Sequence, residues 1–598
     1  MSTRARCSDF VCLCLHCVKN VALFACLVLA STTGTQAQAA APQEPAELIL
    51  HNAIVWTVDA NQPTAEAVAI RDGRIVFVGD NQEAMEMRGP NSRVMDLEGK
   101  FLMPGFNDTH THFSSAARFY EFNIMAVNSQ EAFVERIKAL AAELPAGEWI
   151  VGGFWGAYDE WALGSAGGDQ REPFRPDMRL IEEFTAEHPV FLNKFDNSEF
   201  AANRAALRAA KLDPDDPQVR GVEFVRDDDG PTGVFHGDRA GTVFRLVAPR
   251  EFSRERRVKQ TRHALNMIAA AGVTNISDMS DDTQLDIFRE LHAAGELPIR
   301  IHYRYMLDRW PELKARGIKV GSGDAWIRLG ALKGHIDGIM GTSSARFFEP
   351  YSNDPNNRGS WRRLMTDDRG EVVPGQFLNH MLEADKAGLQ LTVHAIGDEA
   401  NHLLLDYLEE LEKQNGARDR RFRLVHAQVL APSDFARLGP LGVIAEVQPF
   451  HLSDDMRWME LRIGAERCKT AYAFRSIQDS GATLAFGTDW PGTSAAEYPI
   501  NPLLGLYAAV QRQTVNQEPP EGWYAAERIN IRDAIKAYTL NSAYANFEES
   551  EKGSITVGKL ADMTVLSRNL LEIPAEELLE TEVLYTIVDS RIVFQKEN

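Results

Sequence analysis

The sequence is poor in cysteine and has fewer basic than acidic residues. Five of its six cysteines fall between residues 7 and 26, and Cys468 is the only other one. Such a chain cannot depend on a disulfide framework or a cysteine-rich metal site, so it must fold around an adequate hydrophobic core. Its 63 basic residues face 85 acidic ones, which gives a formal net charge of −22. A nucleic-acid partner is therefore not expected, because phosphate binding needs a basic surface.

Long hydrophobic runs are also absent, apart from one near the N-terminus. Residues 21–30 (VALFACLVLA) follow the positive charges of Arg4 and Lys19 and precede a small-x-small site at Ala37-Gln38-Ala39. This run matches the core of a signal peptide and is too short to cross a bilayer as a mature helix. We therefore expect a signal peptide over residues 1–39, export to the periplasm or the exterior, and no stable membrane span after cleavage. An uncleaved anchor is the alternative.

The two ends of the remaining chain alternate apolar and polar residues, as strands do. Residues 47–102 show this pattern with a turn signal at Asp72-Gly73, and the pattern returns after Gly553. We expect the N-terminal part to form a small antiparallel sheet. Both ends then join in one β-sandwich, built from residues 46–104 and 549–598.

Between these ends, apolar strand-like runs alternate with amphipathic helices such as residues 261–272. Eight such units predict an α/β fold, a TIM-like (β/α)8 barrel over residues 105–548. Residues from about 113 to 260 break the rhythm, so we expect a large insertion after the first strand. It includes a strand at 189–195 and a helix at 199–211. The expected barrel strands are 105–112, 272–279, 298–305, 328–335, 389–396, 422–428, 442–449 and 483–490.

The first barrel strand ends in Asp108-Thr109-His110-Thr111-His112. Residues i and i+2 of a strand point to the same side, so His110 and His112 can aim two imidazoles at one point. Neutral imidazole is the commonest metal ligand, and this pair is a start for a divalent metal site. Two surface or capping histidines are the alternative for the motif on its own.

Four later strands also carry one polar residue each near their C-terminal ends, in otherwise apolar runs. The C-terminal ends of barrel strands build the active site in this fold. A single histidine in such a place is more often a hydrogen-bonded core residue than a ligand. Together with the first pair, however, the set predicts a metal centre. The four residues are Lys333, His394, His426 and Asp489.

Lys333 would point into a crowded, cation-rich interior. Burial and neighbouring cations lower the pKa of a lysine, and a neutral amine can react with carbon dioxide to give a carbamate. That anion has two oxygens and can bridge two metal ions. The alternative is a lysine whose ammonium group reaches the rim of the barrel.

The chain resembles the amidohydrolase superfamily, specifically its amidohydrolase-3, YtcJ-like branch, which includes N-substituted formamide deformylases. The resemblance implies a barrel that carries one or two divalent ions, with zinc as the expected metal, and a β-sandwich made from both termini. It also implies that the two histidines of the first motif, His394, His426 and Asp489 are metal-site residues, with Lys333 as the carboxylated bridge. The matching motifs lie at residues 104–112, 332–333, 337–338, 393–398, 425–427, 448–449, 487–491 and 553–562.

We expect the chain to hydrolyse a carbon–nitrogen bond, other than a peptide bond, in a small-molecule amide. A metal lowers the pKa of its bound water to near 7, and Asp489 would act as general base. A deaminase, or a hydrolase of cyclic amides or lactones, is the alternative on the same barrel, and a non-catalytic binding protein belongs to another class. For its assembly we consider a homodimer.

Four further residues are candidates for substrate contacts. Each has a structural alternative: a packed tryptophan, a solvated loop histidine, or hydrogen bonding around the fourth strand for the other two. These candidates are Trp155, His451, His335 and Asp337.

Overall fold

The structure, a computed structural model, describes residues 44–156, 174–215, 221–242, 252–493 and 496–597. The predicted signal peptide, residues 1–39, therefore lies outside the described residues. Cys468 is buried and has no disulfide partner among them. No helix in the described ranges is long and apolar enough to cross a membrane. The account below concerns residues 45–598, which form one unit of the chain.

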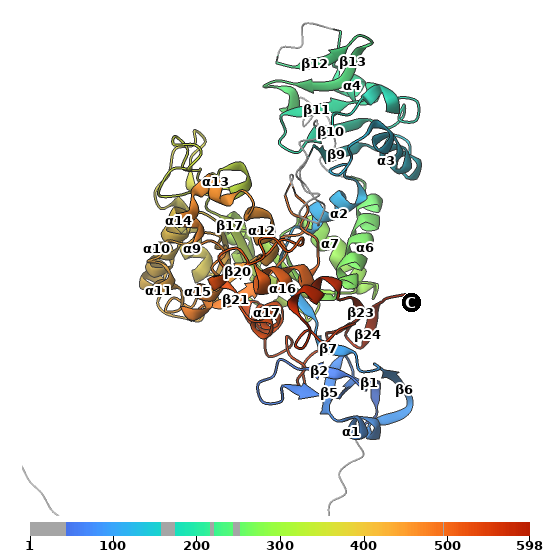
Figure 1. Cartoon of the computed structure of the whole chain (residues 1–598), viewed down its shortest axis with the longest axis vertical. Helices are drawn as coiled ribbons and strands as arrows, with labels where there is room; N and C mark the ends of the chain where they lie inside the picture. The colour runs from blue at the N-terminus through green and yellow to red at the C-terminus, as the bar shows by residue number, and fades with distance from the viewer. Residues whose placement is uncertain (1–43, 157–173, 216–220, 243–251, 494–495, 598) are drawn as a thin grey trace, which may run out of the picture. The chain divides into compact units, whose positions relative to one another are not determined.

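Eight parallel strands form a nearly closed barrel, which confirms the predicted (β/α)8 fold (Figure 1). The first and last strands approach each other through the parallel bridge between Thr111 and Trp490, and the His112 N–H donates to the Trp490 carbonyl at 2.8 Å. In sheet order the strands are β8 (Phe106–Thr111), β14 (Val273–Asp278), β15 (Arg300–Met306), β17 (Ile327–His335), β18 (Gln390–Ala395), β19 (Arg423–His426), β20 (Ile444–Val447) and β21 (Thr483–Phe486).

Amphipathic helices pack on the outside of this barrel. Helix α7 (Asp282–Ala293) begins at Asp281, whose side chain accepts from the Gln284 N–H, and it buries Leu285, Phe288 and Leu291 on one face. This spacing of three residues places one apolar stripe towards the strands. Similar stripes seat α6 (Arg254–Ala270), α9 (Gln376–Lys386) and α10 (Asp398–Asn415).

The insertion after β8 contains its own five-stranded sheet. Its strands, in sheet order, are β12 (Glu223–Asp227), β13 (Gly230–His236), β11 (Glu199–Ala202), β10 (Val190–Lys194) and β9 (Ile150–Trp155). The predicted helix over residues 199–211 is therefore partly wrong. Residues 199–202 pair with β10 and β13 instead, and α4 (Arg204–Ala210) begins only after Asn203, whose side chain accepts from the Val190 and Ala206 N–H groups.

The two ends of the chain meet in a β-sandwich, as expected. One sheet contains β5 (Arg74–Gly79), β4 (Ala67–Arg71), β1 (Ala46–His51) and β6 (Arg88–Asp96), and the other contains β24 (Arg591–Gln595), β23 (Val583–Val588), β22 (Met563–Leu566), β7 (Phe101–Pro104), β2 (Ile54–Trp56) and β3 (Thr64–Ala65).

The expectation that the N-terminal part forms a purely antiparallel sheet is wrong, because β1 pairs β6 and β2 pairs β7 in parallel. The chain passes from the first sheet to the second twice, from β1 to β2 and from β6 to β7, and returns once between them, from β3 to β4. The second crossing runs beside the first in the same direction, so both pairs are parallel.

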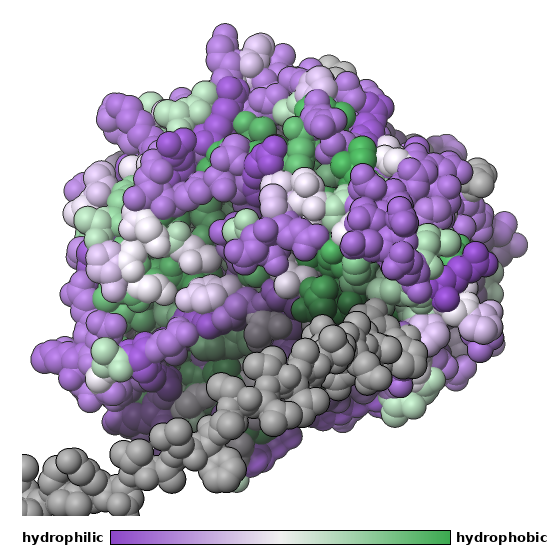
Figure 2. Space-filling view, turned by 90° about the horizontal axis from the view of Figure 1, so that it is seen from below, coloured by the Kyte–Doolittle hydropathy of each residue, from purple (hydrophilic) through white to green (hydrophobic). Residues whose placement is uncertain are grey.

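The surface shows no extended hydrophobic face in the view of Figure 2, where hydrophilic residues predominate and hydrophobic ones form smaller patches between them. The most exposed large hydrophobic side chains among the described residues are Leu461 and Val557. Singly exposed hydrophobic residues are normal on proteins, so these two do not by themselves mark a docking surface.

A buried ion pair joins the barrel to the sandwich. The Arg300 guanidinium on β15 donates to both carboxylate oxygens of Asp562 at 2.7 and 3.0 Å, and both side chains are almost fully buried. The guanidinium also lies over the Trp326 ring, 4.7 Å from its centroid. Because the two residues come from the barrel and from the segment that enters β22, this pair fixes how the two parts meet.

Replacing Asp562 with alanine should lower the free energy of unfolding by about 3 kcal/mol, because it leaves a buried guanidinium with only the partly exposed carboxylate of Asp589, 3.4 Å away, as its counter-charge. Chemical unfolding of the purified chain measures this. Glu466→Ala is the control: its ion pair with Lys469 is exposed, and its loss should change stability by less than about 1 kcal/mol. Equal losses for both variants would contradict this role of the Arg300–Asp562 pair.

Candidate metal centre

The two histidines of the first motif approach one carboxylate. His110 lies near the C-terminal end of β8 and is fully buried, whereas the side chain of His112, just after the strand, is 37% exposed. The Nε2 atoms of His110 and His112 lie 3.4 and 3.1 Å from Asp489 Oδ1. The structure thus brings together three predicted site residues, and the exposure of His112 marks the side from which solvent reaches them.

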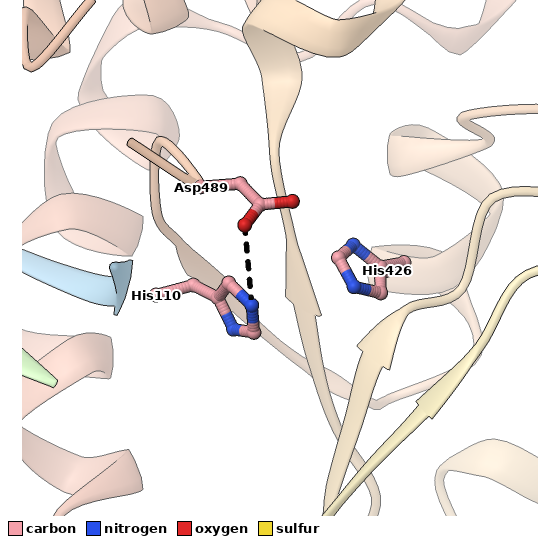
Figure 3. A group of neighbouring side chains, drawn as sticks. All are labelled: His110, His426 and Asp489. Atoms are coloured by element: carbon pink, nitrogen blue, oxygen red, sulfur yellow. Dashed lines mark ion pairs between the residues drawn. The ribbon is translucent and has the colours of Figure 1, made fainter. Parts of the chain in front are cut away.

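His110, His426 and Asp489 form a group that could hold a metal ion (Figure 3). Each offers one ligand atom, and these atoms all lie within 4.8 Å of one another. His426 is the last residue of β19, and Asp489 follows β21. Both residues have positive φ angles, 74° and 60°. Such backbone is uncommon for residues other than glycine and clusters at functional sites. Here it accompanies two side chains that reach the same point.

Each of three histidines has one ring nitrogen occupied by a protein acceptor. His110 Nδ1 lies 2.7 Å from Glu446 Oε1, His426 Nδ1 lies 2.7 Å from Gln448 Oε1, and His394 Nε2 lies 2.9 Å from the Gly338 carbonyl. A neutral imidazole that donates through one nitrogen offers a lone pair at the other. Metal-binding histidines are held in this way, so the donor set fits a divalent metal.

The electrostatics of the group also suit metal binding. Burial lowers the pKa of His110 to about 3, and it holds the pKa of His426 well below its usual value, so both rings stay neutral at physiological pH. Burial alone would raise the pKa of Asp489. The neighbouring His110 and His112 outweigh burial, however, and hold that pKa well below its usual value. The site therefore combines neutral imidazoles with an ionised carboxylate.

Lys333 lies inside the barrel and not at its rim. It is fully buried, and its Nζ lies 3.4 Å from His110 Nε2. The pKa of Lys333 is lowered to about 7, mainly by burial and also by Arg304, although Glu446 acts in the opposite direction. A substantial fraction of this lysine is thus a neutral amine near pH 7.

Two of the candidate substrate contacts lie beside this group. The His335 ring at the end of β17 is centred 5.4 Å from the His394 ring, which in turn lies 4.5 Å from that of His426. His451 is on α12 (Pro449–Asp455), and its Nε2 lies 3.7 Å from Asp489 Oδ2. It is buried and not solvated.

The other two candidates are placed differently. Trp155 ends β9 in the insertion and is fully buried among apolar side chains such as Phe133 and Ile150, so the structure does not bring it to the histidines. Asp337 follows β17 and accepts from the backbone N–H groups of Ile396, Gly397 and Arg346 at 2.9–3.1 Å. That geometry matches hydrogen bonding around the fourth barrel strand, although His394 Nε2 is also 3.4 Å away.

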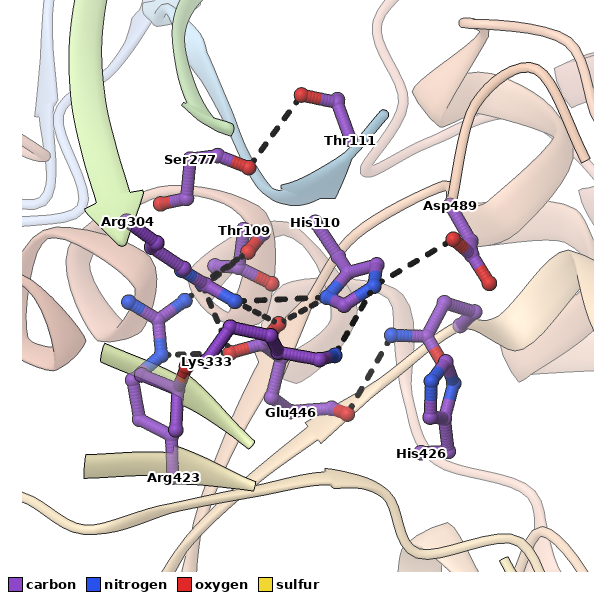
Figure 4. A network of polar contacts seen from close by, with 12 residues as sticks. Thr109, His110, Thr111, Ser277, Arg304, Lys333, Arg423, His426, Glu446 and Asp489 are labelled. Atoms are coloured by element: carbon purple, nitrogen blue, oxygen red, sulfur yellow. Dashed lines mark hydrogen bonds and ion pairs between the residues drawn. The ribbon is translucent and has the colours of Figure 1, made fainter. Parts of the chain in front are cut away.

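Arg304, Arg423 and Glu446 were missed from the sequence, and Gln448 was found only as part of a family motif, without a role in the site. Arg304, Arg423 and Glu446 form a buried charged network next to His110 (Figure 4). Burial alone would raise the pKa of Glu446, but Arg304 and Arg423 hold it well below its usual value. The sequence shows the three charged residues as single charges within apolar strand runs. Glu446 and Gln448 also have the i, i+2 spacing that places two side chains on one face of a strand.

A parallel barrel that gathers neutral imidazoles and an ionised carboxylate at its strand ends is the architecture of a metal-dependent hydrolase. The model of the amidohydrolase family matches residues 93–594. The chain belongs to this family and is a hydrolase of the metal-dependent amidohydrolase superfamily, in its YtcJ-like branch. The resemblance seen in the sequence motifs is therefore confirmed.

Curated relatives match along most of their length. Protein LONG AFTER FAR-RED 3 of Arabidopsis thaliana is 33% identical and covers 88% of this chain and 88% of its own. YtcJ of Bacillus subtilis (strain 168) is 27% identical, over 92% and 99%. N-substituted formamide deformylase of Arthrobacter pascens is 26% identical, over 92% and 98%.

A solved structure shares the fold. It is an uncharacterized metal-dependent hydrolase from Pyrococcus furiosus, with a TM-score of 0.68 and 24% identity. The match covers 88% of this chain and 100% of that one.

Replacing Asp337 with asparagine should destabilise the protein by about 1.5–3 kcal/mol. The carboxylate offers two acceptor oxygens to the three backbone N–H groups, whereas the amide would offer only one. Chemical unfolding measures the change. Asp228→Asn is the control, since Asp228 is exposed in the turn between β12 and β13 and should give less than about 0.5 kcal/mol. Similar values for the two variants would remove this role from Asp337.

Proposed function

We propose that this chain hydrolyses a carbon–nitrogen bond, other than a peptide bond, in a small-molecule amide. The observation that carries the proposal is the ionised Asp489 carboxylate, which lies between two histidine rings on one side and His451 on the other. The name of the Arthrobacter pascens relative, an N-substituted formamide deformylase, supports the amide class of substrate. N-substituted formamides are therefore the first substrates to test.

His110, His112, His394, His426 and Asp489 would hold one or two divalent ions, with zinc as the expected metal. Bound there, such an ion lowers the pKa of a water to near 7 and polarises a carbonyl group. The residues themselves orient the reactants. Asp489 accepts a proton from the attacking water and delivers it to the nitrogen as the carbon–nitrogen bond breaks.

Lys333 has a second part in this proposal. Its neutral Nζ bonds to the carbon of carbon dioxide and releases one proton, which leaves a carbamate anion with two ligand oxygens. Its burial and its distance of 3.4 Å from His110 Nε2 support this assignment, because the new oxygens would extend into the same group of ligand atoms. Such a carbamate would add two anionic ligand oxygens to this group of residues, which would suit two ions per chain.

The proposal predicts that zinc-loaded protein releases an amine from N-substituted formamides or other N-acyl amines. A strong chelator should abolish the activity, and added zinc should restore it, with metal counted per chain by elemental analysis. Cyclic amides, lactones and amino-substituted rings in the same panel test the alternative reactions. Turnover confined to the aminated rings would indicate a deaminase, and a fully loaded protein inactive on every compound would refute a hydrolytic role.

The proposal also predicts that Asp489→Asn lowers kcat by about 10²–10⁴-fold, the usual contribution of a general base, while metal content stays close to that of the wild type. Asp434→Asn is the matched control. Asp434 is also buried and also bonds a histidine, His402, at 2.9 Å, but it lies outside the metal group and should keep normal turnover. Near-normal kcat in Asp489→Asn would exclude Asp489 as the base.

A further inference from the structure

We propose that Glu446 is a positioning residue that fixes the orientation and the tautomer of His110, and that Arg304 and Arg423 hold Glu446 in place for this task. The inference rests on the proposed metal centre and deepens it, since it names what prepares one ligand before any ion binds. All four side chains are fully buried.

Both oxygens of the Glu446 carboxylate are engaged (Figure 4). Oε1 lies 2.7 Å from His110 Nδ1 and accepts from Arg304 at 2.9 Å. Oε2 accepts from Arg304 at 3.0 Å and from Arg423 Nε at 2.6 Å. A carboxylate bound on both oxygens by two planar guanidinium groups cannot rotate freely, so it presents Oε1 to His110 in one orientation.

This contact determines which nitrogen of His110 is free. An ionised carboxylate has no proton to donate, and guanidinium groups have no acceptor, so the proton in the His110–Glu446 contact is on Nδ1. Nε2 then carries the lone pair. That atom is the one that lies 3.4 Å from Asp489 and 3.4 Å from Lys333 Nζ, within the group of ligand atoms. A carboxylate behind a metal-binding histidine orients the ring and strengthens it as a ligand.

The same arginines also hold the backbone beside His110. Arg423 donates to the Thr109 carbonyl at 3.1 Å, and Arg304 donates to the same oxygen. Among the described residues, strand β8 forms a ladder with β14, which two register shifts interrupt, and its other edge has the isolated bridge between Thr111 and Trp490, which follows β21. The arginines on β15 and β19 therefore tie β8 to strands across the barrel interior and limit movement of His110.

A purely structural role for this network predicts a different result. Buried arginine–carboxylate pairs are strongly destabilising to break, wherever they lie, because they leave unpaired charge behind. If Glu446 served only as a counter-charge, its loss would lower stability without a specific effect on metal affinity. A positioning role predicts a loss of metal affinity beyond that seen when an equivalent pair is broken elsewhere.

The experiment measures zinc affinity, by competition with a chelator, and thermal unfolding on the same full-length preparations. Glu446→Gln removes the charge, and Glu446→Asp keeps it but withdraws the carboxylate from His110 by one methylene. Asp562→Asn is the matched control, because Asp562 is also a buried carboxylate bonded to a buried arginine but has no contact with the histidines. We expect a zinc Kd weakened by about 10–100-fold in both Glu446 variants and unchanged in the control.

The outcomes separate this inference from the proposed function. If the wild type does not bind zinc, the metal centre itself is refuted. If the wild type binds zinc and both Glu446 variants bind it as tightly as the control, only the positioning role is overturned. Should the variants fail to fold, histidine-selective ¹⁵N labelling of the metal-free wild type reads the tautomer directly: a proton on His110 Nδ1 supports the inference, and one on Nε2 overturns it.

Discussion

The constraint on which the site depends is the burial of charge inside the barrel. Arg304, Lys333, Arg423 and Glu446 are fully buried on strands of the barrel, whose interior usually packs branched apolar side chains. A charge removed from water must be paired and hydrogen-bonded, or else neutralised. Pairing therefore requires that residues from strands far apart in the sequence meet at fixed distances, and the closed barrel provides that arrangement.

Much of the barrel could be predicted because its signal is local. An apolar run such as Leu424-Val425 and an amphipathic helix such as α7 can be recognised from their own sequence pattern, without knowledge of their tertiary contacts. The strand-end residues followed from the fold, since parallel strands present the same end to the site. His110, His426 and Asp489 could thus be grouped before any distance was known.

What could not be predicted depends on partners distant in the sequence. Residues 199–202 have a helix-like composition, yet β10 and β13 recruit them as a strand, and the Asn203 side chain stops the helix from extending backwards. The parallel pairing of β1 with β6 depends on two crossings from the first sandwich sheet to the second in the same direction. Glu446 looked like an ordinary charged strand residue, because nothing local reveals the two arginines that neutralise it.

The three histidine contacts together show how a barrel can prepare a metal centre in advance. The partner of His426 directly follows the next strand, the partner of His394 lies in the loop after the preceding strand, and the partner of His110 is on β20, two strands away in the barrel. Because the acceptors bond different ring atoms, they leave Nε2 free on two rings and Nδ1 free on the third. The orientation of the ligands is therefore set by groups that do not contact the ion. Because the rings are already ordered, metal binding loses little additional conformational entropy.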